Sequence, residues 1–391
     1  MERDRVTQPR RNILFVTGTR ADFGKLKPLI RAVADSPRFD YTVFVTGMHT
    51  LGLYGVTGKE VEKAGFRNIH FYMNQIINEP MDMILANSVT GMARFVHETP
   101  PDMIVVHGDR VEALAGAIVG ALRNILVCHI EGGELSGTID GLIRHATSKM
   151  SHLHFVANEE AARRLAQLGE APQSIFVIGS PDIDIMASPN LPSIEATKTY
   201  YDIIHDRYGI VLFHPVTTEV DCLRECTRNM VDALLESGRD YVVIYPNNDE
   251  GTGLILDEYR RLRGNPRFRI FPSIRFEFFL TLLKHADLIV GNSSAGIREA
   301  PFYGLPTVNI GTRQDGRHNY CSITNVGYDK DAILDGIHQA LERPRFPPDD
   351  HFGCGDSVGR FMAALNDEAT WTLSRQKQFV DLPSLHSAVK P

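Results

Sequence analysis

The chain has 391 residues, of which 43% are hydrophobic and 23% are charged. This length exceeds that of a usual single domain and allows a large buried core, so we expect two globular domains and exclude a fibrous or disordered chain. The formal net charge of −7, with no long run of Lys or Arg, argues against nucleic-acid or membrane-surface binding.

Short runs rich in Val, Ile and Phe alternate with amphipathic stretches along the first half, which predicts a parallel sheet covered by helices. The strands predicted there are 12–17, 41–46, 103–107, 125–130, 153–157 and 175–178. A second series follows the Pro- and Ser-bearing stretch at 187–193. Its strands are 210–214, 241–245, 269–271, 288–290 and 307–310.

We therefore predict an α/β protein of two Rossmann-like domains, residues 1–185 and 186–391, facing each other across a cleft. The tail after Pro344 is rich in proline and then amphipathic around residues 361–371. A last helix at about 356–375 is predicted to pack back on the first domain. Polar and glycine-rich loops follow several strands, and ligands of open parallel sheets bind at the carboxyl ends of the strands. The interdomain cleft is the expected site.

Five cysteines are present, which is an odd number without a CxxC pattern, and this favours free thiols in a reducing compartment. They are Cys128, Cys222, Cys226, Cys321 and Cys354. The polar residues 1–11 lead into the first strand without the apolar segment of a signal peptide. No run reaches the length of a membrane span, so we expect a cytoplasmic protein.

The segment TGTRADFGKL, residues 17–26, resembles a P-loop but has the wrong spacing, and Leu26 replaces the Ser or Thr that a magnesium-bound nucleotide needs. What remains is a glycine turn with Arg20 and Lys25 near a helix start, which suits an anion. A tight turn with solvated charges is the alternative interpretation.

The segment VGNSSAGIREAPFYG, residues 290–304, is more specific. Its pattern predicts a strand, a turn bearing Ser293 and Ser294, and a helix that begins near Ala295. Hydroxyls and backbone N–H groups at such a turn bind diphosphate oxygens, and Glu299 suits the paired hydroxyls of a ribose. The alternative is an ordinary serine N-cap.

Carboxylates gather where two neighbouring apolar strands end, in HGDRVEA (107–113) and HIEGGELSGTIDGLIRH (129–145). A single carboxylate there would be an ordinary solvated group. Several at adjacent strand ends indicate acid and base catalysis. The acidic residues are Asp109, Glu131, Glu134 and Asp140.

His214 and Asn247 follow two further predicted strands. Either residue alone would more often be structural than a ligand contact. His152 and His154 form an HxH pair without a nearby carboxylate to complete a metal site. We expect these two histidines to be packing residues and predict no metal and no cofactor.

Taken in order, these segments resemble the hydrolysing UDP-N-acetylglucosamine 2-epimerases of sialic acid biosynthesis, both the bacterial enzymes and the epimerase half of the bifunctional animal enzyme. The resemblance covers nearly the whole chain. The stretches that carry it are TGTRADFGKLKPLI, HGDRVEALAGA, CHIEGGELSGTIDG, FHPVTTE, YPNND, GNSSAGIREAP and GTRQ. It implies the GT-B fold, and the kinase domain of the animal enzyme is absent from this sequence.

The resemblance also implies roles for particular residues. Asp109, Glu131 and Asp140 would carry the chemistry. UDP would lie mainly against the second half, with the base near Ile274 and Phe276. The implied UDP contacts are Arg20, Lys25, Arg110, His214, Asn247, Ile274, Phe276, Ser293, Ser294, Glu299 and Arg313. A homo-oligomer, dimer or tetramer, is expected.

The implied reaction is an anti elimination of UDP to give 2-acetamidoglucal, followed by hydration to N-acetylmannosamine. Three alternatives remain open at this point. The same chemistry could act on UDP-2,4-diacetamido-2,4,6-trideoxyglucose for legionaminic acid, or the chain could be a GT-B glycosyltransferase that needs an acceptor. It could also be a catalytically silent protein that binds a UDP-sugar.

Overall fold

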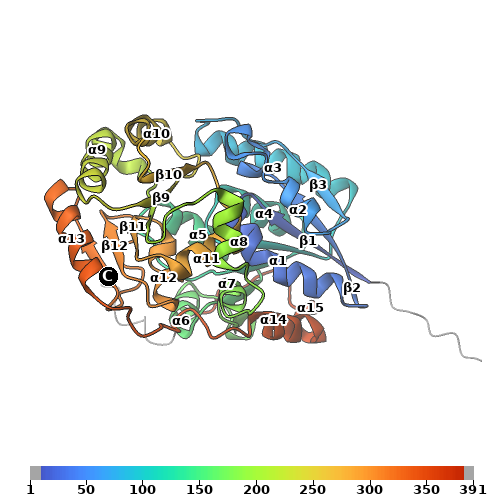
Figure 1. The fold of residues 1–391 in the computed structure, drawn as a ribbon. Helices are drawn as coiled ribbons and strands as arrows, with labels where there is room; N and C mark the ends of the chain where they lie inside the picture. Colours follow the sequence, from blue (N-terminus) through green and yellow to red (C-terminus); the bar gives the residue numbers. More distant parts are fainter. Residues whose placement is uncertain (1–9, 383–391) are drawn as a thin grey trace, which may run out of the picture.

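Two all-parallel sheets follow one another along the chain in the computed structural model, which describes residues 10–382 (Figure 1). The first sheet has seven strands in the order β3-β2-β1-β4-β5-β6-β7. The strands are β1 Arg11–Thr17, β2 Phe39–Val45, β3 Ile69–Phe71, β4 Met103–His107, β5 Leu126–Ile130, β6 Leu153–Val156 and β7 Ile175–Val177. Residues 1–9, the first part of the polar start considered above, lie outside the described residues.

Helices cover both faces of this sheet, which explains why its central strands are apolar on both sides. The helices of the first half are α1 Arg20–Ala34, α2 Lys59–Lys63, α3 Met81–Glu98, α4 Val111–Leu122, α5 Ile139–Met150, α6 Glu159–Gln167 and α7 Pro181–Met186. Short 3₁₀ helices are η1 Gly47–Thr50, η2 Gly52–Tyr54 and η3 Pro172–Ser174. Residues of α1 and α2 pack on one face, and residues of α3 and α4 on the other.

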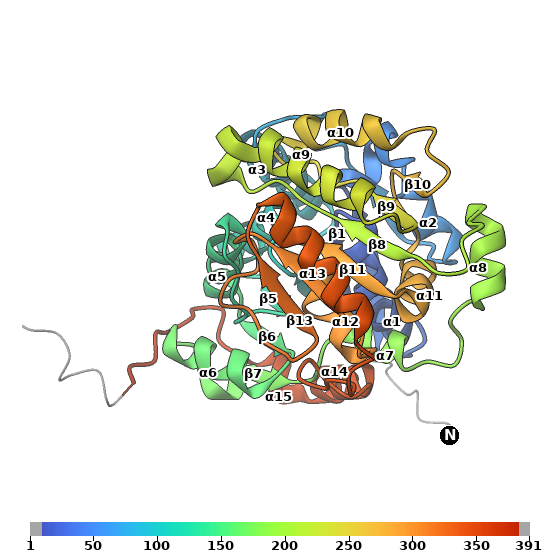
Figure 2. The ribbon, with the colours of Figure 1, turned by 60° about the vertical axis from the view of Figure 1, so that its left-hand side comes forward.

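The second sheet has six strands in the order β10-β9-β8-β11-β12-β13. The strands are β8 Gly209–Leu212, β9 Tyr241–Ile244, β10 Phe268–Phe271, β11 Leu288–Gly291, β12 Thr307–Ile310 and β13 Ile323–Val326. The helices are α8 Ile194–Tyr201, α9 Val220–Glu236, α10 Thr252–Tyr259, α11 Phe276–His285, α12 Glu299–Phe302 and α13 Lys330–Glu342, with η4 Thr217–Glu219, η5 Arg260–Leu262 and η6 Ser294–Gly296. Figure 2 shows α9 and α13 lying over the sheet, where their side chains share a core with its strands.

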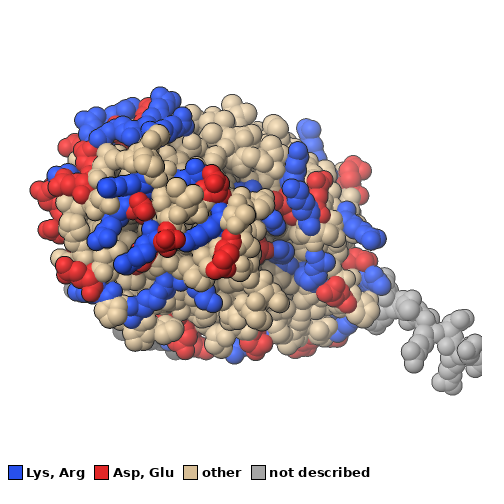
Figure 3. Space-filling model, in the orientation of Figure 1, with Lys and Arg blue, Asp and Glu red and all other residues tan. Residues whose placement is uncertain are grey.

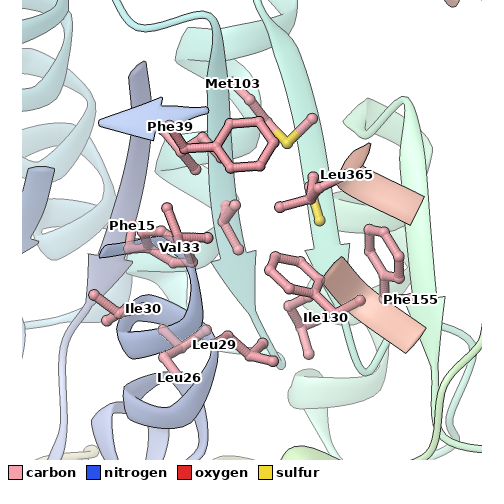
Figure 4. Packing of buried hydrophobic residues seen from close by; sticks show 14 of the residues in the cluster. Phe15, Leu26, Leu29, Ile30, Val33, Phe39, Met103, Ile130, Phe155 and Leu365 are labelled. Carbon is pink, nitrogen blue, oxygen red and sulfur yellow. The ribbon is translucent and has the colours of Figure 1, made fainter. Parts of the chain in front are cut away.

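The last two helices, α14 Ser357–Asn366 and α15 Glu368–Trp371, return to the first half (Figures 1 and 2). Their side chains Phe361, Leu365 and Trp371 belong to the same buried cluster as Phe39 and Phe155 of the first sheet. Figure 4 shows Leu365 among the labelled side chains of this cluster. The first half therefore completes its core with residues from the end of the chain.

The prediction of two Rossmann-like α/β halves is confirmed, and the arrangement matches the GT-B fold. Two edge strands, β3 and β13, were not predicted because their sequences, IHF and ITNV, are short and partly polar. Positive and negative side chains are mixed on the face seen in Figure 3. Arginines of α9 and η5 form ion pairs, Arg224 with Asp257 and Arg261 with Asp232. Within residues 10–382 no helix combines the length and apolarity that crossing a membrane requires.

Candidate active site

A cavity of about 260 Å³ lies between the two halves, lined by loops at the carboxyl ends of both sheets. The strand order reverses between β1 and β4 and again between β8 and β11, and such reversals open a crevice for ligands. All fourteen site residues predicted from the sequence line this one cavity. They are Arg20, Lys25, Asp109, Arg110, Glu131, Asp140, His214, Asn247, Ile274, Phe276, Ser293, Ser294, Glu299 and Arg313.

Asp109 follows β4 after a turn at Gly108, whose φ of +72° favours glycine. Its carboxylate accepts a hydrogen bond from the Arg144 guanidinium and lies 3.5 Å from that of Arg317. Burial raises the pKa of the Asp109 carboxyl, but the two guanidiniums outweigh burial and hold its pKa at about 2. Asp109 is therefore ionised at neutral pH.

Glu131 ends β5 with a φ of +63°, a strained conformation for a residue with a side chain. Its Oε1 accepts a 2.7 Å hydrogen bond from Arg298, and its Oε2 lies 3.0 Å from Nε2 of His107 and 3.5 Å from Nζ of Lys25. Burial opposes ionisation, yet Arg298 and Lys25 hold the pKa of the Glu131 carboxyl well below its usual value. A strained, buried and ionised carboxylate is typical of a functional site.

Asp140 lies in the first turn of α5, where the Thr138 side chain accepts a hydrogen bond from its backbone N–H. Its carboxylate accepts a 3.0 Å hydrogen bond from Arg313 of the second half. The pKa of the Asp140 carboxyl is nevertheless raised, because burial and the nearby carboxylates of Asp109 and Asp249 outweigh Arg313. Of the three predicted catalytic carboxyls, this one holds a proton most readily.

His214 follows β8 and is positioned by its neighbours. Its backbone N–H donates to Asn292 Oδ1 at 2.7 Å, and its Nδ1 accepts a 3.1 Å hydrogen bond from the backbone N–H of Asn247. Burial lowers the pKa of the imidazole well below its usual value, and Arg313 and Arg110 act in the same direction. The ring is thus neutral.

The serine turn, residues 292–296, differs from the helix predicted to begin at Ala295. Residues 294–296 form the 3₁₀ helix η6, and the separate α12 has only four residues. Pro301 has no N–H to bond to the carbonyl of Ile297, so a continuous α-helix through this segment would lose a hydrogen bond. Any anion site here therefore relies on the hydroxyls and N–H groups of the turn, since a helix this short adds little dipole.

Lys25 and Glu299 belong to a buried charge cluster beside the cavity. Nζ of Lys25 lies 3.0 Å from Asp182 and 3.4 Å from Glu299, in addition to its contact with Glu131. Burial and the Asp182 carboxylate raise the pKa of the Glu299 carboxyl to about 7. Its Oε2 is buried and accepts no hydrogen bond from any described residue. Glu299 lines the cavity and has one carboxylate oxygen without a donor among the described residues, whereas the charge of Lys25 is already matched by three carboxylates.

The remaining predicted contacts lie on both sides of the cavity. Arg20 donates a 2.5 Å hydrogen bond to Glu60, and Arg110 donates one of 3.3 Å to Glu112. Apolar side chains gather on the second-half wall and give space for a planar base. They include Leu212, Ile244, Ile274, Phe276 and Phe279.

Several residues of the site were not predicted from the sequence. Arg144, Arg298 and Arg317 are almost fully buried, and their guanidiniums contact the carboxylates. His107 lies in HGDRVEA and Arg298 in VGNSSAGIREAPFYG, two segments that already held predicted site residues. Their nearness along the chain to those residues could have marked them as site residues. Ser180 and Asp182 follow β7 at the same edge of the sheet, where a strand-end rule would have found them.

Nε2 of His154 donates a 2.9 Å hydrogen bond to the buried Glu170 carboxylate, and Nδ1 of His152 accepts a 3.1 Å hydrogen bond from the Val127 N–H. Both histidines thus make packing and hydrogen-bond contacts of the first half. In the described part of the chain no three His, Cys, Asp or Glu side chains are grouped as metal ligands.

Residues 31–366 match the family described as UDP-N-acetylglucosamine 2-epimerase. The chain is 51% identical over 375 residues to the UDP-N-acetylglucosamine 2-epimerase of Neisseria meningitidis serogroup B, covering 95% of this chain and 99% of that protein. It is 33% identical over 361 residues to the UDP-N,N'-diacetylbacillosamine 2-epimerase (hydrolyzing) of Legionella pneumophila, covering 90% and 94%.

A crystal structure of a Neisseria meningitidis UDP-GlcNAc 2-epimerase bound to UDP-GlcNAc has a TM-score of 0.76 to this chain at 19% identity, covering 90% and 99% of the two chains. At that identity the match shows the fold. Fold and cavity together define a two-domain α/β protein of the GT-B type, with a cavity between its two halves. The chain belongs to the UDP-N-acetylglucosamine 2-epimerase family, as its motifs indicated.

Proposed function

We propose that the protein is the hydrolysing kind of this family. It would convert UDP-N-acetylglucosamine and water to N-acetylmannosamine and UDP, supplying the sugar from which sialic acids are built. The observation that carries this proposal is the convergence of Asp109, Glu131 and Asp140 at one cavity, which His214, Ser293 and Ser294 line from the second half. The resemblance to a relative named as hydrolyzing supports it.

UDP would bind against the second half. The serine turn, with Ser293 and Ser294, and the neutral His214 would contact the diphosphate, and Arg20, Arg110 and Arg313 would balance its charge. Glu299 would accept the ribose hydroxyls through its free oxygen. The base would lie near Ile274 and Phe276, and Asn247 would help to hold the nucleotide.

The carbon–oxygen bond at C1 then breaks, and its electron pair goes to the diphosphate. An ionised carboxylate takes the proton from C2, and the electron pair of that bond forms the double bond of 2-acetamidoglucal. Asp109 and Glu131 are ionised and suit the base, whereas Asp140, with its raised pKa, suits proton delivery. Water adds at C1 and gives up one of its protons to a carboxylate, and C2 receives a proton on the face opposite to the one that lost it.

The cavity wall also bears on the sugar. Each lining residue from the carboxylate-bearing segments is polar or glycine, namely His107, Gly108, Asp109, Arg110, Glu131, Asp140 and Arg144. A hydroxymethyl group finds hydrogen-bond partners there, whereas the C5 methyl of a trideoxy sugar would prefer apolar contacts. The similarity to the Legionella pneumophila enzyme keeps the diacetamido sugar as the second candidate.

Isotope labelling tests the proposal. Turnover of UDP-N-acetylglucosamine in deuterated water is expected to place one deuteron on C2 of N-acetylmannosamine. Turnover in oxygen-18 water is expected to label the anomeric oxygen, examined early, and to leave UDP unlabelled. Product without deuterium at C2, or labelled UDP, would exclude this mechanism. Release of UDP without an acceptor separates it from a glycosyltransferase, and parallel assays with both sugars settle the substrate.

Asp109→Asn is expected to lower kcat by about 10² or more while UDP affinity stays nearly unchanged, as for a group that acts in the transition state. Activity is expected to survive EDTA, because the arginines and the serine turn can balance the diphosphate. A location in the cytoplasm, a dimeric or tetrameric state and a domain boundary near residue 185 stay predictions.

A further inference from the structure

Arg298 links the nucleotide wall of the second half to the catalytic wall of the first. It lies between η6 and α12, four residues after Ser294 on the serine turn. Its guanidinium crosses the cleft and donates hydrogen bonds of 2.7 Å to Glu131 and 2.6 Å to Ser180, and one to Glu134. The side chain is 3% exposed, and its guanidinium stacks 4.5 Å from the Phe352 ring. One short segment thus touches both the predicted diphosphate site and a predicted catalytic carboxylate.

Few contacts besides Arg298 hold the outer end of Glu131. Its oxygens also face Nζ of Lys25, the His107 ring and the Ser180 hydroxyl, which come from α1, β4 and the loop after β7. The backbone of Glu131 has a φ of +63°, so packing and these polar contacts must hold the residue in place. Arg298 is the only one of these partners that comes from the second half.

We propose that Arg298 is a positioning residue, which ties the serine turn to Glu131 so that a UDP-sugar seated on that turn meets a carboxylate already oriented for proton transfer at C2. This inference rests on the proposed function, in which Glu131 exchanges a proton with the sugar. The planar guanidinium suits the task, because its fork of donors reaches Glu131, Glu134 and Ser180 at once. A lysine would keep the charge but lose the bridge.

Charge and geometry can therefore be separated by two substitutions. Arg298→Lys keeps a cation beside Glu131 and loses the bridge, whereas Arg298→Gln removes the cation as well. The other charged or titratable groups near Glu131 are Lys25, His107, Asp182, Glu134 and Arg144, and neither substitution removes any of them. Lys27→Met is the matched control, because Lys27 also forms an ion pair across the two halves, with Glu277, and takes no part in the cavity.

The measurements are kcat, KM, the pH profile of kcat and the Kd of UDP. Arg298→Lys is expected to lower kcat about tenfold or more, to change the Kd of UDP less than about threefold, and to keep the pH profile flat on the acid side. In Arg298→Gln, loss of the cation raises the pKa of Glu131, so activity is expected to fall with falling pH at a higher pH than in the wild type. Lys27→Met is expected to behave as the wild type.

Turnover of UDP-N-acetylglucosamine by the wild type is measured first, because the absence of turnover would refute the proposed function. With an active wild type, an unchanged kcat in Arg298→Lys would overturn this inference alone. So would equal losses of kcat and UDP affinity, or the same loss in Lys27→Met. Arg298→Gln removes the cation that the two buried carboxylates Glu131 and Glu134 share. If this variant does not fold, the kcat and Kd of Arg298→Lys decide the question.

Discussion

The backbone N–H of Asn247 donates a hydrogen bond of 3.1 Å to Nδ1 of His214. Since Nδ1 is the acceptor, the single proton of the neutral ring is on Nε2. This contact joins the ends of two adjacent strands, β8 and β9, and leaves the imidazole with one N–H donor for a ligand.

The first prediction concerns that tautomer. Nitrogen NMR of the imidazole is expected to show His214 as the neutral Nε2–H form, because burial, Arg313 and Arg110 lower its pKa well below the usual value of a histidine. His214→Ala is expected to weaken UDP binding about tenfold through the lost hydrogen bond. A ring that titrates near pH 6.5, or that carries its proton on Nδ1, would contradict the assignment.

Glu299 gives a pH-dependent prediction. The pKa of the Glu299 carboxyl is about 7, so at neutral pH this carboxyl carries a proton in a fraction of the free protein molecules. Ribose hydroxyls that donate to Glu299 favour the ionised form and lower this pKa, so UDP binding near pH 7 is expected to release protons. The release should vanish at pH values well above 7.

Calorimetry of UDP binding in buffers of different ionisation enthalpy measures this release. Glu299→Gln is the control, since it keeps the shape of the side chain but has no proton to release. Equal proton release in the wild type and in Glu299→Gln would remove this residue from the ribose site.

Gly137 provides a steric prediction. Gly137 belongs to the first half, and its N–H donates a 3.1 Å hydrogen bond to the carbonyl of Arg313 in the second half. A Cβ atom added to Gly137 would lie 2.1 Å from the carbonyl oxygen of Thr312. Gly137→Ala is therefore expected to push the halves apart there and to lower both kcat and UDP affinity, with little change in secondary structure. Gly327→Ala, which meets open space, is the control and is expected to be neutral. Equal kinetics for both variants would count against this close approach.

The end of the chain gives a stability prediction. Leu365 is fully buried in the core of the first half, so Leu365→Ala is expected to lower the free energy of unfolding by about 2–5 kcal/mol. Ile204→Ala, at a residue 73% exposed, should change it by less than about 0.5 kcal/mol. Denaturant titration checks both. Trp371, the single tryptophan, stacks on Phe39, and its fluorescence should change together with the circular dichroism of the first half.

The sequence was a good guide to the sheets and to the cavity because apolar strand runs and the polar loops that follow them are local patterns. Eleven of the thirteen strands were predicted in this way. All fourteen residues expected at the site line the cavity, several of them expected only from the family resemblance, and their roles stay predictions. The edge strands β3 and β13 escaped because a strand with one neighbour need not be apolar, and IHF and ITNV are partly polar. The other two edge strands, β7 and β10, were predicted because IFV and FRIF are mostly apolar. The break between η6 and α12 could have been suspected from Pro301.

Buried arginines were the main omission. A pattern of hydrophobicity assigns a charged residue to the surface, yet Arg144, Arg298 and Arg317 are stable in the interior because buried carboxylates of distant segments surround them. Arg298 and Arg317 are each more than a hundred residues from Glu131 and Asp109, their partners, and Arg144 is 35 residues from Asp109, although it also lies 3.9 Å from Glu134 of the nearer loop. Only the fold brings them together, so local sequence carries no sign of the pairing.

The return of α14 and α15 to the first half also has a consequence for synthesis. A ribosome delivers the first sheet long before Phe361, Leu365 and Trp371, which belong to the core of that sheet. The nascent first half is therefore left with uncovered apolar surface while the second half is made. Its final closure is a post-translational event, and a product that terminates early would expose that surface permanently to chaperones and proteases.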